Sequence, residues 1–230
     1  MSRVVIDIET VPVDWTQLEA EEQEYLLQNA HTNEEQEKVR EQLGLFPLTG
    51  RVIAIGMLNP DTVKAVVMAE GIPGEGAAWA HEEGVEFWTG NETEILERFW
   101  DVVKRYQQIV TFNGRSFDGP YLMLRSLMLG VPATRNLVPN RYKVGDHLDL
   151  LDVLTLYGSI RRYSLDFLCR RLGIGSPKSD MRGKDVAAAY KAGKMEEIAR
   201  YCLEDVRATA RLLSRTEEAL GVLVQTAAST

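Results

Sequence analysis

The first strand expected in this chain carries two acidic side chains among apolar ones. Residues 3–9 read Arg-Val-Val-Ile-Asp-Ile-Glu, an alternating pattern that predicts a β-strand. Side chains two positions apart project from the same face of a strand, so Asp7 and Glu9 are expected side by side. Two neighbouring carboxylates in an apolar strand repel each other and lose hydration, and a bound cation is the simplest compensation. The alternative is a strand end that reaches solvent, where both acids are hydrated.

The elements predicted after this strand indicate one α/β domain with a mixed central β-sheet flanked by helices. An acidic helical insertion is expected at about residues 14–43, and a hairpin around Asn59-Pro60-Asp61. The domain is expected to cover residues 1–220, followed by a frayed tail at 221–230. The remaining predicted elements are loops at 71–84 and 131–144, a strand at 108–112, a helix at 92–106 capped by Asn91, a buried helix at 118–129, and helices at 147–157, 164–172, 184–192 and 195–219.

The helix predicted at residues 195–219 carries an acid on its apolar face. At 100° per residue, Asp205 falls inside the apolar arc and Tyr201 lies at its edge, one turn earlier. An acid on the inward face of a helix is rarely left unpaired. The alternative is a buried salt bridge to Arg200 or Arg207, which point elsewhere around the helix.

A third acidic position follows the strand predicted at 108–112. Residues 111–118 read Thr-Phe-Asn-Gly-Arg-Ser-Phe-Asp, so a turn at Asn113-Gly114 ends the strand and Asp118 starts the next helix. Taken alone, Asp118 has an ordinary explanation as an acid that stabilises a helix N-terminus.

In this chain order the three elements resemble the DEDD superfamily of 3′-5′ exonucleases. The motifs are Asp-x-Glu at 7–9, Asn-Gly-x-x-Phe-Asp at 113–118 and Tyr-x-x-x-Asp at 201–205. A tyrosine four residues before the last aspartate resembles the DEDDy branch, whereas the DEDDh branch has a histidine where this chain has Arg200. The resemblance extends from about Val4 to Leu213 and points to the stand-alone bacterial proteins related to the exonuclease domain of family B DNA polymerases.

The resemblance implies a ribonuclease H-like fold and phosphodiester hydrolysis by a two-metal mechanism. It implies that two divalent cations, Mg²⁺ or Mn²⁺, are held by four carboxylates, with Asp7 shared by both ions: Asp7, Glu9, Asp118 and Asp205. It makes Tyr201 the residue that orients the attacking water. The expected substrates are 3′ ends of single-stranded DNA or RNA, and the expected products are nucleoside 5′-monophosphates.

Substrate contacts are also implied by the resemblance. Thr10 is expected near the terminal sugar, and Asn113 and Phe117 near the penultimate nucleotide, with Phe117 equally explicable as core. Basic candidates for phosphate contacts are Arg115, Arg141, Lys143, Arg161 and Arg162. Three further acids are expected at helix surfaces or caps: Asp149, Asp152 and Asp166. Of these, Asp149 is the best candidate for a role in the site.

The net charge of −8 is distributed unevenly. Residues 1–100 hold 6 basic and 20 acidic side chains, while residues 101–230 hold 20 basic and 14 acidic ones. The insertion at 14–43 alone contributes a net charge of −7. The charge of the rest of the chain is therefore compatible with limited binding to the end of a nucleic acid. Cys169 and Cys202 are expected as core thiols. The sequence shows no signal peptide and no apolar run long enough to cross a membrane, which predicts a cytoplasmic protein without membrane association.

Two other functions stay open at this point. One is a non-catalytic nucleic-acid-binding or scaffold module on the same fold, although a pure binder gains nothing from four acids near phosphate. The other is a two-metal hydrolase of short oligonucleotides, because the motif specifies chemistry rather than polymer length. Turnover of dinucleotides compared with longer oligomers separates this second alternative from the exonuclease.

Overall fold

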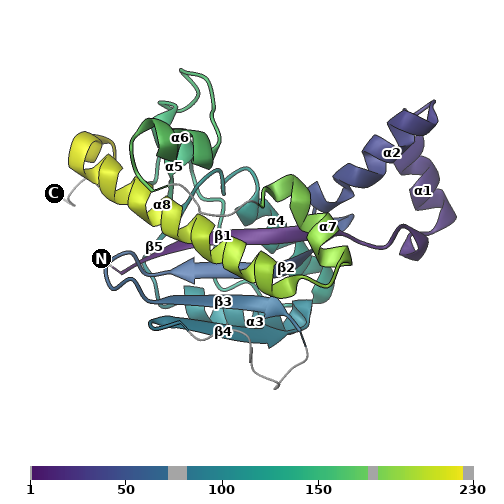
Figure 1. Cartoon of the computed structure of the whole chain (residues 1–230), viewed down its shortest axis with the longest axis horizontal. Coiled ribbons are helices and arrows are strands. Elements are labelled where there is room, and N and C mark those ends of the chain that lie inside the picture. Colours follow the sequence, from purple (N-terminus) through teal and green to yellow (C-terminus); the bar gives the residue numbers. More distant parts are fainter. Residues whose placement is uncertain (1, 72–81, 176–180, 225–230) are drawn as a thin grey trace.

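A six-stranded mixed sheet forms the centre of the computed structural model, which describes residues 2–71, 82–175 and 181–224 (Figure 1). The strands lie in the order β4-β3-β2-β1-β5-β6. Their bounds are β1 Arg3–Pro12, β2 Gly50–Leu58, β3 Ala65–Glu70, β4 Val85–Gly90, β5 Gln108–Thr111 and β6 His147–Asp149. Strand β2 is antiparallel to both neighbours and the other pairs are parallel, which confirms the predicted mixed sheet.

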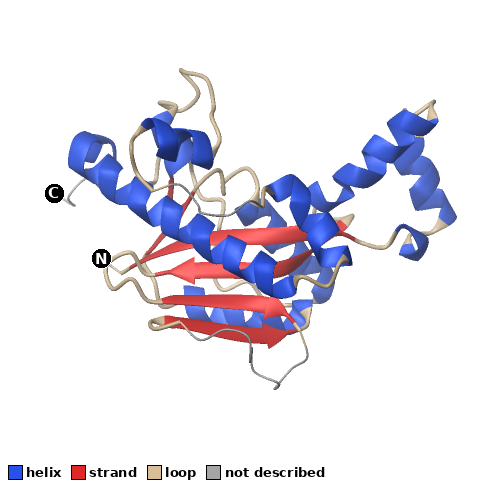
Figure 2. Ribbon diagram, viewed as in Figure 1, coloured by secondary structure: helices blue, strands red, loops and turns tan. Residues whose placement is uncertain are grey.

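Helices cover both faces of this sheet (Figure 2). Helices α3 (Glu92–Val103) and α4 (Asp118–Leu129) contribute to the core on one face. The long helix α8 (Met195–Val224) crosses the other face, together with the shorter α5 (Leu150–Leu154), α6 (Leu165–Arg171) and α7 (Val186–Lys191). The predicted cap of α3 is confirmed, because the Asn91 side chain accepts a hydrogen bond from the Glu94 amide.

Strand β1 divides its side chains between these two layers. Ile6 and Ile8 belong to the core formed with α3 and α4, whereas Val5 packs in the core formed with α8. Asp7 and Glu9 continue the alternation that begins at Val5, so both face α8. The apolar residues on either side fix this register, since a shift by one residue would turn Asp7 and Glu9 into the apolar core formed with α3 and α4.

Helix α8 approaches the sheet closely at Gly56 of β2, which pairs with Asp7 of β1. A Cβ atom at Gly56 would lie 3.0 Å from the Cys202 sulfur and 3.2 Å from the Cys202 carbonyl oxygen. Because only a hydrogen occupies that position, the residues of α8 around Cys202 come within reach of β1. This contact sets how far Asp205 stands from Asp7.

The acidic insertion is a helical arm, as predicted. It contains α1 (Ala20–Leu27) and α2 (Asn33–Gln42) with 3₁₀ turns at Trp15–Gln17 and Leu43–Leu45, and α1 and α2 have no buried residue. Figure 1 shows both helices extending away from the end of β1. The arm returns through Gly44, whose carbonyl oxygen accepts hydrogen bonds from the Thr10 hydroxyl (2.7 Å) and the Tyr121 hydroxyl (3.0 Å).

Two predictions about strands are corrected by the structure. Residues 147–149 form strand β6 rather than the start of a helix, because they pair with β5 in a buried position. No strand was expected at the position of β4. Its residues form a strand because they pair in parallel with β3, a contact that the local sequence does not reveal. Of the loop predicted at 71–84, residues 72–81 lie outside the described residues.

Two predictions about helices also need correction. Helix α4 is buried on one face only, since Leu127 is 76% exposed and Met128 50% exposed. Helix α8 continues to Val224 past a non-helical residue at Leu220, so the first four residues of the expected tail at 221–230 are helical and 225–230 lie outside the described residues. None of the helices in the described ranges combines the length and the apolar content that a membrane crossing requires.

Candidate active site

A cavity of about 840 Å³ opens beside the carboxyl-terminal half of β1. Its walls come from β1, the turn after β5, the start of α4, helices α7 and α8, and the α2 end of the arm. The eight residues predicted for the site all line it: Asp7, Glu9, Thr10, Asn113, Phe117, Asp118, Tyr201 and Asp205. The fold therefore gathers side chains that are up to 198 positions apart in the sequence.

Four carboxylates from three elements meet in this cavity: Asp7 and Glu9 on β1, Asp118 at the start of α4, and Asp205 on α8. Glu9 and Asp118 are buried, with 6% and 5% of their surface exposed. Within the part of the chain that the structure describes, none of the four forms an ion pair with a lysine or an arginine. Among the described residues, no basic partner therefore offsets the charge that these groups carry when they are ionised.

Burial and nearby negative charges raise the pKa of all four carboxyl groups; for Asp205 these charges are Glu204 and Asp166. Burial is the larger cause for each, and the charge of Asp205 acts on Asp7, Glu9 and Asp118. The pKa of Asp118 is raised to about 7 and that of Asp205 to about 6, while the pKa values of Asp7 and Glu9 lie well above their usual range. Such a cluster is stabilised by cations, and its oxygen-only donors suit hard ions such as Mg²⁺ or Mn²⁺.

The Cys202 sulfur lies close to this cluster, but the thiol packs in the core and takes no part in the chemistry that we assign to the carboxylates. One ligand atom each of Asp7, Glu9 and Cys202 lie within 4.8 Å of one another. Burial raises the pKa of the Cys202 thiol, which donates a weak hydrogen bond to the Asp7 carbonyl oxygen at 3.6 Å. A protonated thiol packed against Gly56 agrees with the prediction of a core cysteine.

Tyr201 stands one helical turn before Asp205 on α8 and lines the same cavity. Its hydroxyl lies near Asp205 and lowers the pKa of the Asp205 carboxyl, partly offsetting the effect of burial. Burial and the nearby carboxylates raise the pKa of Tyr201 above its usual value. The side chain is therefore a neutral hydroxyl at physiological pH.

Asp149 holds the turn that carries Asn113. Its two carboxylate oxygens accept hydrogen bonds from the amides of Asn113 (2.9 Å) and Arg115 (3.0 Å). Asn113 adopts a left-handed φ of 69°, which asparagine tolerates better than most residues. The same carboxylate caps α5 through the Leu151 amide at 2.9 Å, so the predicted capping role is present and a link to the site is added.

Two residues near this turn differ from their prediction. Arg115, a candidate for phosphate contacts, is only 9% exposed and its guanidinium donates to the carbonyl oxygens of Asn140 and His147. Asp152, expected at a helix surface or cap, is buried and pairs with Arg141 at 2.6 Å. By contrast, Asp166 is half-exposed on α6, where it pairs with Arg170.

The structure adds basic residues that the sequence did not single out. Lys184 and Lys191 line the cavity from the α7 side, and Arg40 lines it from α2 of the arm. Only the folded chain brings these positions together, although both lysines belong to the more basic part of the sequence, residues 101–230. Phe117 combines both of its expected roles, since its ring packs 5.4 Å from that of Tyr121 and still lines the cavity.

Comparison with known proteins gives a family for this chain. Residues 51–229 match the model of a family described as predicted 3′-5′ exonuclease related to the exonuclease domain of PolB. The match includes Asp118, Tyr201 and Asp205, and it begins after the strand that carries Asp7 and Glu9.

Curated relatives and solved structures point the same way. The chain is 31% identical over 138 residues to the DNA polymerase of Pyrococcus glycovorans, a match that covers 53% of this chain and 18% of the polymerase. It is 31% identical over 140 residues to the DNA polymerase of Thermococcus litoralis, which covers 53% of this chain and 8% of that polymerase. The chain thus spans less than a fifth of the length of these relatives.

The solved structure of the family B DNA polymerase from the hyperthermophilic archaeon Pyrobaculum calidifontis matches 94% of this chain and 24% of that chain, with a TM-score of 0.59 and 20% identity. This likeness shows the fold and confirms the predicted ribonuclease H-like architecture. Taken with the family match over residues 51–229, it leads to one conclusion: the chain belongs to the family of predicted 3′-5′ exonucleases related to the exonuclease domain of PolB.

Proposed function

We propose that this protein is a metal-dependent 3′-5′ exonuclease of the DEDDy type that degrades single-stranded DNA or RNA to nucleoside 5′-monophosphates. One observation carries the proposal: four carboxylates and Tyr201 converge in one cavity although they come from β1, α4 and α8. The family relationship supports it independently. We further propose that residues 1–220, with the helical extension to Val224, act as one domain in the cytoplasm.

Asp7, Glu9, Asp118 and Asp205 are the residues proposed to hold two divalent cations, Mg²⁺ or Mn²⁺. When bound, these cations would offset the charge of the scissile phosphate and lower the pKa of the attacking water. The raised pKa values of the four carboxyl groups support this assignment, because each would release its proton more readily beside a cation.

Tyr201 is proposed to aim the attacking water. Its hydroxyl is close enough to Asp205 to lower the pKa of that carboxyl, and a tyrosine oxygen can accept a hydrogen bond from a water molecule. Since the pKa of Tyr201 is raised, the ionised form is negligible at neutral pH and the residue orients the water without deprotonating it.

The rest of the cavity is proposed to hold the end of the strand. Thr10 follows Glu9 directly and would meet the terminal sugar, while Asn113 and Phe117 would contact the penultimate nucleotide. Lys184 and Lys191 on the opposite wall offer positive charge to phosphates.

The test is degradation of 5′-labelled oligonucleotides, DNA and RNA, with Mg²⁺ or Mn²⁺. A ladder that shortens from the 3′ end, with nucleoside 5′-monophosphates as product, is the expected result. No ladder on either polymer with either metal contradicts the proposal. Tight binding without turnover would instead indicate the non-catalytic module, and a strong preference for dinucleotides would indicate the hydrolase of short oligonucleotides.

A further inference from the structure

Exposed aromatic and basic side chains gather on two segments outside the cavity, residues 141–143 and 156–172. Tyr142 is 66% exposed, Tyr163 38% and Phe167 45%, and every residue from 158 to 164 is exposed. We call these positions the Arg–aromatic surface, which consists of Arg141, Tyr142, Tyr157, Arg161, Arg162, Tyr163 and Phe167. Solvent-exposed aromatic rings in such number are unusual on a surface without a partner.

The rings of this surface are arranged in two pairs, each with an arginine beside it. Tyr163 and Phe167 stack with centroids 4.7 Å apart and an interplanar angle of 13°, and the Arg161 guanidinium lies 5.4 Å from the Tyr163 ring. The rings of Tyr142 and Tyr157 are 4.9 Å apart, with Arg141 5.6 Å from the Tyr157 ring.

The Tyr157 position is fixed by an unusual backbone. Tyr157 has a left-handed φ of 58°, and its amide donates to the Asp152 carbonyl oxygen at 2.7 Å. A tyrosine in this conformation costs stability, and the surrounding structure compensates for that cost.

Positive charge dominates the two segments, with six basic residues against one acid, Asp166. Arg141 and Arg170 are engaged with Asp152 and Asp166. Across the described ranges of the chain, four of the six form no ion pair: Lys143, Arg161, Arg162 and Arg171. Unpaired cations interleaved with exposed rings match the chemistry of a strand of phosphates and unpaired bases.

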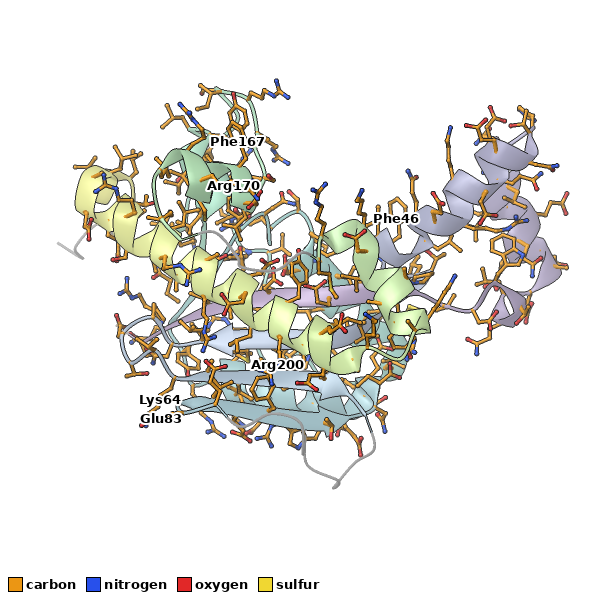
Figure 3. All side chains as sticks on the ribbon, viewed as in Figure 1. Phe46, Lys64, Glu83, Phe167, Arg170 and Arg200 are labelled. Carbon is orange, nitrogen blue, oxygen red and sulfur yellow. The ribbon has the colours of Figure 1, made fainter. Side chains whose placement is uncertain are left out.

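The Arg–aromatic surface is attached to the elements that build the cavity. Asp149 ends β6 and caps α5, and it holds the Asn113 turn; Asp152 lies within α5 and pairs with Arg141. Helix α6 packs on α8, the helix that carries Tyr201 and Asp205. Figure 3 shows α6, with Phe167 and Arg170, on the side of α8 away from β3 and β4.

We propose that the Arg–aromatic surface binds the single-stranded nucleic acid upstream of its 3′ end. Bases would stack on the Tyr142–Tyr157 and Tyr163–Phe167 pairs, and Arg161 and Arg162 would contact phosphates. The inference rests on the proposed function only in placing the 3′ end of the strand in the cavity. Stacking on protein rings requires bases that are not paired, so the surface selects single strands over duplexes.

The experiment measures the affinity of the full chain for a fluorescent twelve-nucleotide oligothymidylate by anisotropy, in EDTA so that no turnover occurs. Tyr163→Ala with Phe167→Ala is expected to weaken binding by about tenfold or more, since the bases that stack on these two rings would lose their contacts. Arg161→Ala with Arg162→Ala is expected to reduce the salt slope of log K by about 1.4, or about 0.7 per phosphate contact.

Matched variants separate a binding role from a general effect. Tyr25→Ala removes an exposed ring on the arm, and Lys104→Ala with Arg105→Ala removes two exposed cations at the end of α3, and both should bind like the wild type. Tyr163→Phe with Phe167→Tyr keeps both rings and should retain affinity. Thermal melting confirms that each variant is folded.

The outcomes distinguish this proposal from the exonuclease itself. Unchanged affinity and salt slope in the ring and arginine variants overturn the surface proposal, even if the wild type produces a 3′ ladder, and would leave a protein as the partner for this surface. Weakened binding supports the surface even if no ladder is ever seen. If both proposals hold, the ring variant degrades dinucleotides at the wild-type rate while its KM for twelve-nucleotide substrates rises.

Discussion

Cys202 of α8 lies directly against Gly56 of β2, so close that a Cβ atom at Gly56 would be 3.0 Å from its sulfur. Gly56→Ala is therefore expected to push α8 away from β1, to cost about 1–3 kcal/mol of unfolding free energy and to lower turnover severalfold, because Tyr201 and Asp205 move with the helix. Thermal melting and rate measurements check both effects. Gly175→Ala is the matched control, since a Cβ there meets only the Arg211 side chain at 3.6 Å or more; equal effects in the two variants would contradict the argument.

The carboxylate cluster predicts that the metal-free protein is most stable in mild acid. Asp118, with its pKa raised to about 7, binds more protons in the folded than in the unfolded state, so stability falls as pH rises from about 4 to about 7. The expected loss is about 2–4 kcal/mol, reversed at pH 8 by Mg²⁺ or Mn²⁺. Thermal melts in EDTA across this range test it, and Asp118→Asn should make the profile less steep while abolishing turnover. A metal-free protein whose stability is constant from pH 5 to 8 would show the prediction to be wrong.

Substitution of Tyr201 is expected to slow the chemical step without changing metal binding. Tyr201→Phe removes the hydroxyl and keeps the ring, so kcat should fall by about 10²-fold while the affinity for Mn²⁺ measured by calorimetry stays within about twofold. Asp7→Ala and Asp205→Ala should remove both turnover and Mn²⁺ binding. Tyr25→Phe, on the exposed arm, is the control for loss of a tyrosine hydroxyl. An unchanged rate in Tyr201→Phe would exclude the water-orienting role.

Asp149 is expected to act as a positioning residue. Asp149→Ala leaves the Asn113 and Arg115 amides without their acceptor and should cost about 1–3 kcal/mol of stability, together with a rise in KM for oligonucleotides. Asp149→Asn retains one acceptor oxygen and should restore part of both. A purely structural role would lower stability without changing KM, so the split between KM and kcat decides the matter.

The acidic arm should weaken substrate binding by repulsion. Glu37 and Glu41 of α2 line the cavity, so Glu37→Gln with Glu41→Gln is expected to lower the KM for oligonucleotides severalfold at low salt and to lose this effect at high salt. Glu21→Gln with Glu22→Gln changes the same charge on α1, outside the residues that line the cavity, and serves as control. A KM that does not change at low salt would mean that the arm does not repel the strand.

Local periodicity explains why much of the site was predictable. Asp7 and Glu9 stand out because their neighbours alternate, and Asp205 because it lies on the apolar face of a long helix. Strand β6 was not predicted because its three residues are too few to show an alternation of apolar and polar side chains. They form a strand only because they pair with β5. Arg115 looks basic and available in the sequence, yet its bonding partners Asn140 and His147 are distant in the chain. Lys191 likewise meets the site only through the packing of α7 on β1.

The two hydrogen bonds to the Gly44 carbonyl allow the arm to vary without changing how it is attached to the domain. The Thr10 and Tyr121 hydroxyls hold the returning chain at the point where the arm rejoins the domain, so this attachment does not depend on the length of the arm. The entropic cost of closing an inserted segment rises only slowly with the number of residues in it. A change in the length or charge of the arm is thus expected to alter access to the cavity, which Glu37, Arg40 and Glu41 line, without moving the strand that carries the carboxylates.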